Sequence, residues 1–434
     1  MNKKILYLAI PNIISNLSVP LLTSVDTALM GRMESEIYIG AIALGGLIFN
    51  FVYWSFGFLR MGSTGLTAQA FGEKNDAKLM QILGRALIFG FVSGLVLLLS
   101  QKWLMDFGFY LLDGSQEVEF LAKEYFSIRI WAAPATLCLY GLMGWFFGMQ
   151  NSVVPMVLTI LINVVNIIAN VIFINYFGMK ADGVALGTVI AQYAGFIVAL
   201  VIFYKRHGHL LQYFKRKTIF EIQAFKQFLS LNRDIFIRTF LLVFSFAFFE
   251  NQSAAQGDLT LAVNSILLQF VSWISYGIDG FAYASESLVG RYAGAKDKSN
   301  LRKAINLSFV WAFGLAIVYS LTFYVFEVEL LQLFTNQQNV IDAAQNYMIW
   351  IVLFPIIATS GYIWDGIFIG LTASKAMRNT MILAFMLFMI VFYIADYQLA
   401  TMTNFWLWLT FSLFIFIRGI IQTIYYKMYL VVSD

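Results

Sequence analysis

Apolar segments long enough to cross a lipid bilayer recur along the whole chain, and this repetition restricts its possible folds more than any other feature. A helix needs about 20 residues to span the hydrocarbon core. Short polar breaks separate twelve such runs: 4–30, 39–68, 82–104, 125–148, 153–177, 183–204, 228–250, 260–288, 304–326, 347–371, 377–395 and 405–429. Only 12% of the residues are charged, against about 25% in soluble domains. The sequence therefore predicts an all-α polytopic membrane protein with twelve transmembrane helices.

Lysine and arginine concentrate in alternate polar breaks, and this predicts the orientation of the chain. The basic breaks are 3–4, 74–78, 205–226, 291–303 and 375–378. Because basic loops stay on the cytoplasmic side, both termini are expected in the cytoplasm, with the protein in the cell (inner) membrane. This topology explains the net charge of +4 without a nucleic-acid partner. The first span is too long for a removable signal peptide, and the single cysteine, Cys138, excludes an internal disulfide.

The second half of the chain repeats the first at a constant offset in residue number. The segment FGEKNDAKLMQIL, which begins at Phe71, aligns without a gap with AGAKDKSNLRKAI, which begins at Ala293. Identical pairs at this offset are Gly72 and Gly294 (294 − 72 = 222), Lys74 and Lys296, Tyr140 and Tyr362, and Gly144 and Gly366. Each half holds six spans, so we expect lobes at 1–204 and 228–434, joined by a basic linker at 205–227. Parallel repeats of this kind are typical of transporters that work by alternating access.

The first span carries a carboxylate, Asp26, on a polar helix face. Asn12, Asn16 and Thr23 precede it at helical spacing, and Pro20 leaves the carbonyl of Asn16 without an intrahelical partner. A carboxylate near the middle of a bilayer costs about 2.5–3.5 kcal/mol, so its presence indicates a function. Its counterpart in the second half is Phe248, which carries no charge. Asp26 is therefore the first candidate for an ion-coupling residue, in one lobe only.

The fifth and sixth spans offer neutral polar side chains at membrane depth. Asn163, Asn166 and Asn170 lie on one helix face, and Thr188 lies in the following span. Such a stripe either bonds a neighbouring helix or lines a polar pocket, and the spacing alone does not decide between these interpretations. Together with Asp26, these groups offer mostly oxygen surroundings for a proton or a small cation.

Other intramembrane polar residues are candidates for a substrate or secondary ion site. Arg60 lies among glycines and is expected to form a structural charge pair, to act as a gate, or to couple with a carboxylate. In the second half, Glu250 is either an interfacial carboxylate or a functional one, and Asp279 and Asp365 lie within spans. Asp365 follows Tyr362 by three residues. Tyr140 and Tyr362 are aromatic candidates for the lining of a cleft.

Three stretches give the chain a resemblance over essentially its full length. They are PNIISNLSVPLLTSVDTALMGRM around Asp26, GFLRMGSTGLTAQAFGEKN around Arg60, and DGIFIGLTASKAMRN after the tenth span. With them the chain resembles the multidrug and toxic compound extrusion (MATE) family of cation-coupled antiporters, and the second stretch resembles its DinF-like branch. The resemblance implies a V-shaped pair of six-helix bundles that exports organic, often cationic or amphiphilic compounds in exchange for protons or sodium.

The resemblance also implies roles for particular residues. Asp26 matches the coupling aspartate of the N-terminal lobe, with Asn166, Asn170 and Thr188 as its assistants. Many members have an aspartate where this chain has Asn170, and the loss of that charge favours protons over sodium. The acidic residues of a C-terminal cation site in another branch are similar to Glu250 and Asp365.

The expected protein is thus a proton-coupled multidrug antiporter rather than an enzyme. No span contains a histidine, and no nucleophile is paired with a base. The implied partners are drug-like organic molecules and membrane lipid, with no cofactor, no metal site and a monomeric state. A sodium-coupled antiporter and a flippase for lipid-linked oligosaccharides are the alternatives.

Overall fold

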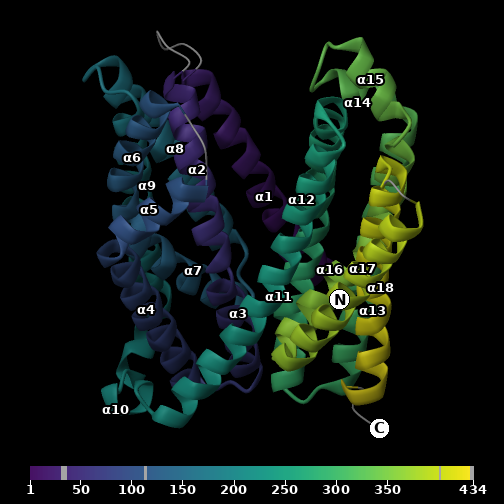
Figure 1. Cartoon of the computed structure of the whole chain (residues 1–434). Helices are drawn as coiled ribbons and strands as arrows, with labels where there is room; N and C mark the ends of the chain where they lie inside the picture. Colours follow the sequence, from purple (N-terminus) through teal and green to yellow (C-terminus); the bar gives the residue numbers. More distant parts are fainter. Residues whose placement is uncertain (31–36, 112–114, 400–401, 431–434) are drawn as a thin grey trace. The chain divides into compact units, whose positions relative to one another are not determined.

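The computed structural model describes residues 1–30, 37–111, 115–399 and 402–430, and within these ranges the chain forms helices joined by short turns (Figure 1). The side chains of residues 19–30 also lie outside the described part. The predictions for Pro20, Thr23 and Asp26 therefore cannot be compared with side-chain positions. The all-α prediction is confirmed for the described residues.

The chain divides into two compact units. Residues 14–230 form one, and residues 1–13 together with 231–434 form the other. The helices within the first are α2 (Ile37–Ser55), α3 (Phe58–Gly72), α4 (Asp76–Leu99), α5 (Gln101–Leu111), α6 (Gln116–Arg129), η1 (Ile130–Ala132), α7 (Ala133–Gly148), α8 (Val153–Asn175), α9 (Ala181–His207), η2 (Gly208–Tyr213) and α10 (Arg216–Ile219). Those within the second are α12 (Asp258–Gly294), α13 (Lys298–Val325), α14 (Glu327–Gln332), α15 (Gln338–Gln345), α16 (Met348–Gly370), α17 (Ser374–Leu399), α18 (Asn404–Tyr425) and η3 (Tyr426–Leu430).

Two long helices, α1 (Asn2–Met30) and α11 (Ile222–Ala255), contribute residues to both units. The division falls after Ile13 in α1 and after Ser230 in α11. The predicted lobes, 1–204 and 228–434, differ from the two units in the grouping of segments 1–13 and 205–230.

Ten helical segments among the described residues are long and apolar enough to cross a membrane. They are Gly40–Gly72, Asp76–Leu99, Gln116–Gly148, Val153–Asn175, Ala181–Tyr213, Asp258–Gly294, Lys298–Val325, Met348–Gly370, Ser374–Gln398 and Asn404–Met428. These correspond to the predicted spans two to six and eight to twelve. Helices α1 and α11, of 29 and 34 residues, occupy the places of the first and seventh spans, in agreement with the predicted twelve.

The internal repeat is visible in the helix packing of each unit. Helix α7 packs on α3 and α4, and α16 packs correspondingly on α12 and α13. A Cβ on Gly144 would lie 2.3 Å from the carbonyl oxygen of Arg60, and a Cβ on Gly366 would lie 2.3 Å from that of Ala282. Both partners are related by the offset of 222 (366 − 144 and 282 − 60). The absence of a side chain at these glycines allows the helix backbones to approach closely.

The repeat also includes the turns that end four of the helices. Among the described residues, Lys74, Gln150, Lys296 and Thr372 are the non-glycine residues with positive φ, between 54° and 62°. Each follows a helix and is part of a Schellman motif; for example, the N–H of Ala373 donates to the carbonyl of Phe368 at 2.8 Å. Lys74 pairs with Lys296, and Gln150 with Thr372, at the same offset (296 − 74 and 372 − 150). The turns were therefore duplicated together with the helices.

The two copies differ within the second span of each half. Helix α12 is unbroken over 37 residues, whereas the corresponding stretch is interrupted at Phe56 and Gly57, between α2 and α3. Gly57 corresponds to Asp279 in α12 (279 − 57 = 222). The break lies directly before the turn of α3 that carries Arg60.

The single cysteine, Cys138, is buried in α7. Its Sγ atom donates to the carbonyl oxygen of Leu87 in α4, at 3.6 Å. The side chain therefore lies within the packed interface between α4 and α7.

Candidate functional sites

In the unit of residues 14–230, a chain of hydrogen bonds joins three of the predicted coupling residues. Asn170 Nδ2 donates to Asn166 Oδ1 at 3.2 Å, and Asn166 Nδ2 donates to Thr188 Oγ1 at 3.1 Å. The Thr188 hydroxyl donates in turn to the carbonyl of Val184 at 3.0 Å. Asn166 and Asn170 are buried on α8, and Thr188 lies on α9. The polar stripe of the fifth span thus bonds the adjacent sixth span.

Asn163, one turn earlier on α8, bonds α1 instead. Its Nδ2 donates to the carbonyl oxygen of Ser18 at 3.3 Å and to the Ser18 hydroxyl at 3.2 Å. This contact places α8 beside the helix that carries Asp26. The Asp26 side chain itself lies outside the described residues.

Arg60 and Tyr140 approach the same region of this unit. The Arg60 guanidinium lies over the ring of Phe147, 5.8 Å from its centroid. Tyr140 is close enough to interact electrostatically with Arg60 and with Arg129. The Arg129 Nη1 atom donates to the Tyr125 hydroxyl at 2.7 Å. Two of the predicted residues therefore belong to one cluster of arginine and aromatic side chains.

In the unit that contains residues 231–434, Asp365 is enclosed by cationic and amide groups. Its Oδ2 atom accepts from Arg418 and forms an ion pair with Arg238. Its Oδ1 atom accepts from Gln422 Nε2 at 2.7 Å. All four residues are at most 6% exposed. One carboxylate thus neutralises part of the charge of two buried guanidinium groups. This pairing stabilises the arrangement, since an unpaired buried charge is strongly unfavourable.

Tyr362 and Asp279 lie beside this ion cluster. The Tyr362 hydroxyl is 2.5 Å from Ser275 Oγ, and its ring lies 5.9 Å from the Arg418 guanidinium. Asp279 interacts electrostatically with both Arg238 and Arg418. With Asp279 included, two carboxylates balance two guanidinium groups.

Glu250 is not brought into this cluster. It is exposed near the end of α11, twelve residues beyond Arg238. Twelve residues correspond to about 18 Å along a helix. Among the predicted residues of the second unit, Asp279, Tyr362 and Asp365 come together and Glu250 does not.

Arg238, Arg418 and Gln422 were not predicted from the sequence. Arg418 is the only charged residue between 405 and 426, and Arg238 lies within the seventh span. An ionisable side chain inside a span is itself a signal of a functional or paired group, so both arginines were detectable. At the offset of 222, the residues that correspond to Arg238, Asp365 and Arg418 are Asn16, Met143 and Phe196. The charge cluster therefore belongs to one unit only.

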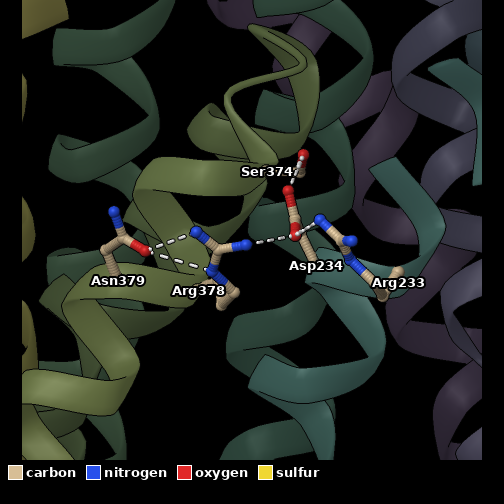
Figure 2. A network of polar contacts seen from close by, with 5 residues as sticks. All are labelled: Arg233, Asp234, Ser374, Arg378 and Asn379. Atoms are coloured by element: carbon tan, nitrogen blue, oxygen red, sulfur yellow. Dashed lines mark hydrogen bonds and ion pairs between the residues drawn. The ribbon is translucent and has the colours of Figure 1, made fainter. Parts of the chain in front are cut away.

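A second buried carboxylate, Asp234, connects α11 with α17 (Figure 2). Its Oδ1 atom accepts from Arg378 Nη1 at 2.7 Å and lies 3.3 Å from Arg233 Nη2. Its Oδ2 atom accepts from the Ser374 hydroxyl at 3.2 Å. Arg378 also donates to the side-chain oxygen of Asn379, which lies on its far side from Asp234 in Figure 2.

The comparison with family models matches both halves of the chain. The MatE model matches residues 11–172 and 235–394, which together make up most of the sequence. The chain belongs to the MatE family. The two matched segments of this MatE chain correspond to the two copies of the internal repeat. A second model, of the lipid II flippase MurJ, matches residues 129–267.

Individual relatives of this MatE family member agree with that assignment. The DNA damage-inducible protein F of Escherichia coli is 33% identical, over 96% of this chain and 90% of its own length. A probable multidrug resistance protein NorM of Bacillus cereus is 24% identical, over 82% of this chain and 79% of its own length. The MATE transporter VcmN of Vibrio cholerae, in its bent form, has a TM-score of 0.84 at 19% identity, with 98% and 96% of the two chains covered. The predicted family and fold class are confirmed.

Proposed function

We propose that the protein is a secondary active antiporter that exports organic, often cationic or amphiphilic compounds in exchange for protons by alternating access. The observation that carries the proposal is the hydrogen-bonded chain of Asn170, Asn166 and Thr188, built on a helix that also bonds α1. Membership of the MatE family supports transport as the activity, and the related proteins named for multidrug resistance support the class of substrate.

The register of α1 against α8 supports Asp26 as the coupling residue. As the first and fifth spans of the predicted topology, the two helices run in the same direction. Asn163 bonds Ser18, and from this contact Asp26 is eight residues further along α1 while Asn170 is seven residues further along α8. At 1.5 Å per residue, these advances are about 12 Å and about 10.5 Å. On this register we expect Asp26 at about the level of Asn170.

A proton on Asp26 would change both charge and hydrogen bonding at this level. A carboxylate only accepts hydrogen bonds, whereas a carboxylic acid also donates one. The neutral amides of Asn166 and Asn170 can partner either form, since an amide carries both donors and an acceptor. Proton and exported compound then favour different conformations, so that each weakens the binding of the other.

The neutral amide of Asn170 and the ion pairs of Asp365 support a proton rather than sodium as the coupling ion. Sodium ions prefer several oxygen ligands with negative charge nearby, and Asn170 contributes no charge. Asp365 has both carboxylate oxygens engaged by Arg238, Arg418 and Gln422, so a second cation site at this residue forms no part of the proposal. Arg60 and Tyr140 in one unit, and Asp279 and Tyr362 in the other, are proposed to contact the exported compound.

The proposal is tested with purified protein in liposomes, with ethidium as a fluorescent cationic probe. We expect a proton gradient to drive ethidium movement and a sodium gradient of equal size to have no effect. Asp26→Asn is expected to abolish exchange while the protein remains folded in the membrane. Glu250→Gln, which also removes a carboxylate from a predicted span, is the matched control and should retain exchange. Undiminished exchange in Asp26→Asn would refute the role of Asp26.

A flippase for lipid-linked substrates is a second candidate, because the MurJ model matches residues 129–267. The same liposomes distinguish it: a fluorescent lipid-linked oligosaccharide should stay in its leaflet if the protein is a drug antiporter. Movement of that lipid without movement of ethidium would favour the flippase.

The proposal includes the setting of the protein. We propose that it resides in the cell membrane as a monomer with both termini in the cytoplasm, in accordance with the concentration of lysine and arginine in alternate loops. It requires no cofactor besides the coupling ion and catalyses no covalent step.

A further inference from the structure

We propose that residues 205–220, which make up most of the linker between the two halves of the sequence, form a binding surface for anionic phospholipid headgroups at the cytoplasmic face of the membrane. The inference uses the predicted orientation but not the transported compound or the coupling ion. It rests on three observations: residues 205–220 are folded, their charged side chains are all basic, and they expose apolar side chains next to that charge.

The linker is folded against α4. Leu210, in η2, is buried together with Leu79, Met80 and Phe203 in a hydrophobic cluster. Ile219, in α10, is fully buried, and its Cδ1 atom lies 2.8 Å from where a Cβ on Gly84 would be.

A buried arginine holds the end of α10 in place. Arg85 of α4 donates through Nε to the carbonyl of Ile219 at 3.0 Å and through Nη2 to that of Thr218 at 2.7 Å. Carbonyl groups at a helix C-terminus attract a cation, and Arg85 satisfies two of them. Any ligand of the linker therefore meets an ordered surface and bears little cost for ordering it.

On the predicted topology, α10 lies near the cytoplasmic end of α4. Gly84 lies eight residues, or about 12 Å, after the first residue of α4. Since α4 is long and apolar enough to span the membrane, a segment that packs on Gly84 lies alongside the first turns of that helix, as Figure 1 shows for α10 and the N-terminal end of α4.

The charge on residues 205–220 has one sign, and the acidic side chain of the linker, Glu221, comes directly after them. Lys205, Arg206, Lys215, Arg216 and Lys217 are exposed, and residues 205–220 contain no acidic side chain. A cluster of four or more basic residues beside a transmembrane helix on the cytoplasmic side is attracted by anionic lipids.

Large apolar side chains accompany this charge. Leu211, Phe214 and Phe220 are 41%, 52% and 50% exposed. Aromatic side chains beside lysine and arginine are typical of segments that lie in the headgroup region, with the apolar groups directed toward the acyl chains. A soluble polyanion offers no such apolar layer, which favours lipid as the occupant.

The other long basic segment, 291–303, serves as an internal comparison. It carries Arg291, Lys296, Lys298, Arg302 and Lys303, but none of its residues, all described, is a large exposed hydrophobic side chain. With Asp297 its net charge is +4 (5 − 1), against +5 for residues 205–220, so net positive charge alone would recruit lipid to both segments to a similar extent.

The test measures which lipids the full-length protein retains. Protein in neutral detergent is mixed with equal amounts of phosphatidylglycerol and phosphatidylcholine, and the lipids that co-elute with it are quantified by mass spectrometry. We expect several-fold enrichment of phosphatidylglycerol on the unmodified chain, and a decrease in that enrichment with added salt. The triple variant Lys215→Gln, Arg216→Gln, Lys217→Gln should lose most of it.

Two further variants make the test decisive. Lys298→Gln, Arg302→Gln, Lys303→Gln removes three charges from the comparison segment and should retain the enrichment. Phe214→Ser, Phe220→Ser should weaken retention although every charge is kept. Equal losses in the two triple variants, or none in either, would overturn the proposal. Binding of a short oligonucleotide by a protein that retains no phosphatidylglycerol would identify a soluble polyanion as the ligand. That result would likewise overturn the proposal.

Discussion

Thr372 is a β-branched residue in the left-handed region of backbone conformation, with φ of 54°. It follows α16 at the position of the Schellman motif where glycine is preferred, because a Cβ there lies too close to the carbonyl oxygen. The other three residues with this geometry, Lys74, Gln150 and Lys296, have unbranched side chains. Thr372 is therefore the most strained of the four.

Thr372→Gly is expected to stabilise the protein by on the order of 1 kcal/mol, because glycine adopts positive φ without the Cβ contact. The measurement is the midpoint of thermal unfolding in detergent. Thr372→Ala retains a Cβ and should gain much less. An equal gain in both variants would locate the effect in the threonine side chain rather than in the backbone.

The polar sites were predictable from the sequence only in part, and the reason is physical. Hydropathy reveals that a charge such as Asp365 is costly within a span, but not which side chain compensates it. Its partners Arg238 and Arg418 belong to α11 and α18, two helices that are distant from it along the chain. Helical spacing describes one helix face, so it predicted that Asn166 and Asn170 share a face and left their bond to Thr188 open.

At the scale of helices, the contact of a glycine with a facing backbone is the feature that the two units share most closely. Gly144 faces the carbonyl of Arg60, and Gly366 faces that of Ala282. A carbonyl oxygen belongs to a helix backbone, so it cannot move aside as a flexible side chain would.

Gly144→Ala and Gly366→Ala are each expected to destabilise the protein by about 1–3 kcal/mol, the usual effect of overpacking. Gly314→Ala is the control, because a Cβ at Gly314 would meet no heavy atom within 4 Å. Folded yield and thermal midpoint provide the measurement. A Gly366→Ala variant as stable as Gly314→Ala would contradict the close approach of α16 to α12.

The network of Asp234 gives a second prediction for helices (Figure 2). Arg378 and Arg233 both approach the buried carboxylate, but their side chains are 23% and 61% exposed. Arg378→Gln should destabilise the attachment of α17 to α11 by about 1–3 kcal/mol, because the buried carboxylate loses its shortest charged partner.

Arg233→Gln removes the same charge and is expected to change stability by no more than about 1 kcal/mol, because exposed ion pairs contribute little. Thermal unfolding of the two variants in the same detergent gives the comparison. A loss for Arg233→Gln as large as that for Arg378→Gln would show that total charge, rather than the buried contact, stabilises this region.

The helices themselves were largely predictable, since an apolar run of sufficient length has few alternatives in a bilayer. The interruption at Phe56 and Gly57 was not. A break within an apolar run leaves hydropathy unchanged, so only the backbone hydrogen bonds reveal it.

For the molecule as a whole, the N-terminal segment Met1–Ile13 groups with the second half of the sequence. Lys4 Nζ donates to the Tyr292 hydroxyl at 3.2 Å, and Trp311 Nε1 donates to Asn2 Oδ1 at 3.2 Å. A Cβ on Gly280 would lie 3.0 Å from the carbonyl oxygen of Ala9. These contacts connect the N-terminus of the chain to α12 and α13.

Removal of residues 2–6 is therefore expected to increase amide hydrogen exchange in α12 and α13 and to leave α4 and α8 unchanged. Hydrogen-exchange mass spectrometry on the truncated and complete chains is the measurement. Faster exchange confined to α4 and α8 would place the N-terminus in the other unit.

The position of Cys138 has a practical consequence for observing motion. A thiol enclosed between α4 and α7 is shielded from maleimide reagents, and the sequence contains no other. The natural chain can therefore be labelled at introduced cysteines without first replacing Cys138. One cysteine introduced on the exposed surface of each unit would carry a pair of spin labels, and their separation would reveal directly whether the two units move when the pH or the transported compound changes.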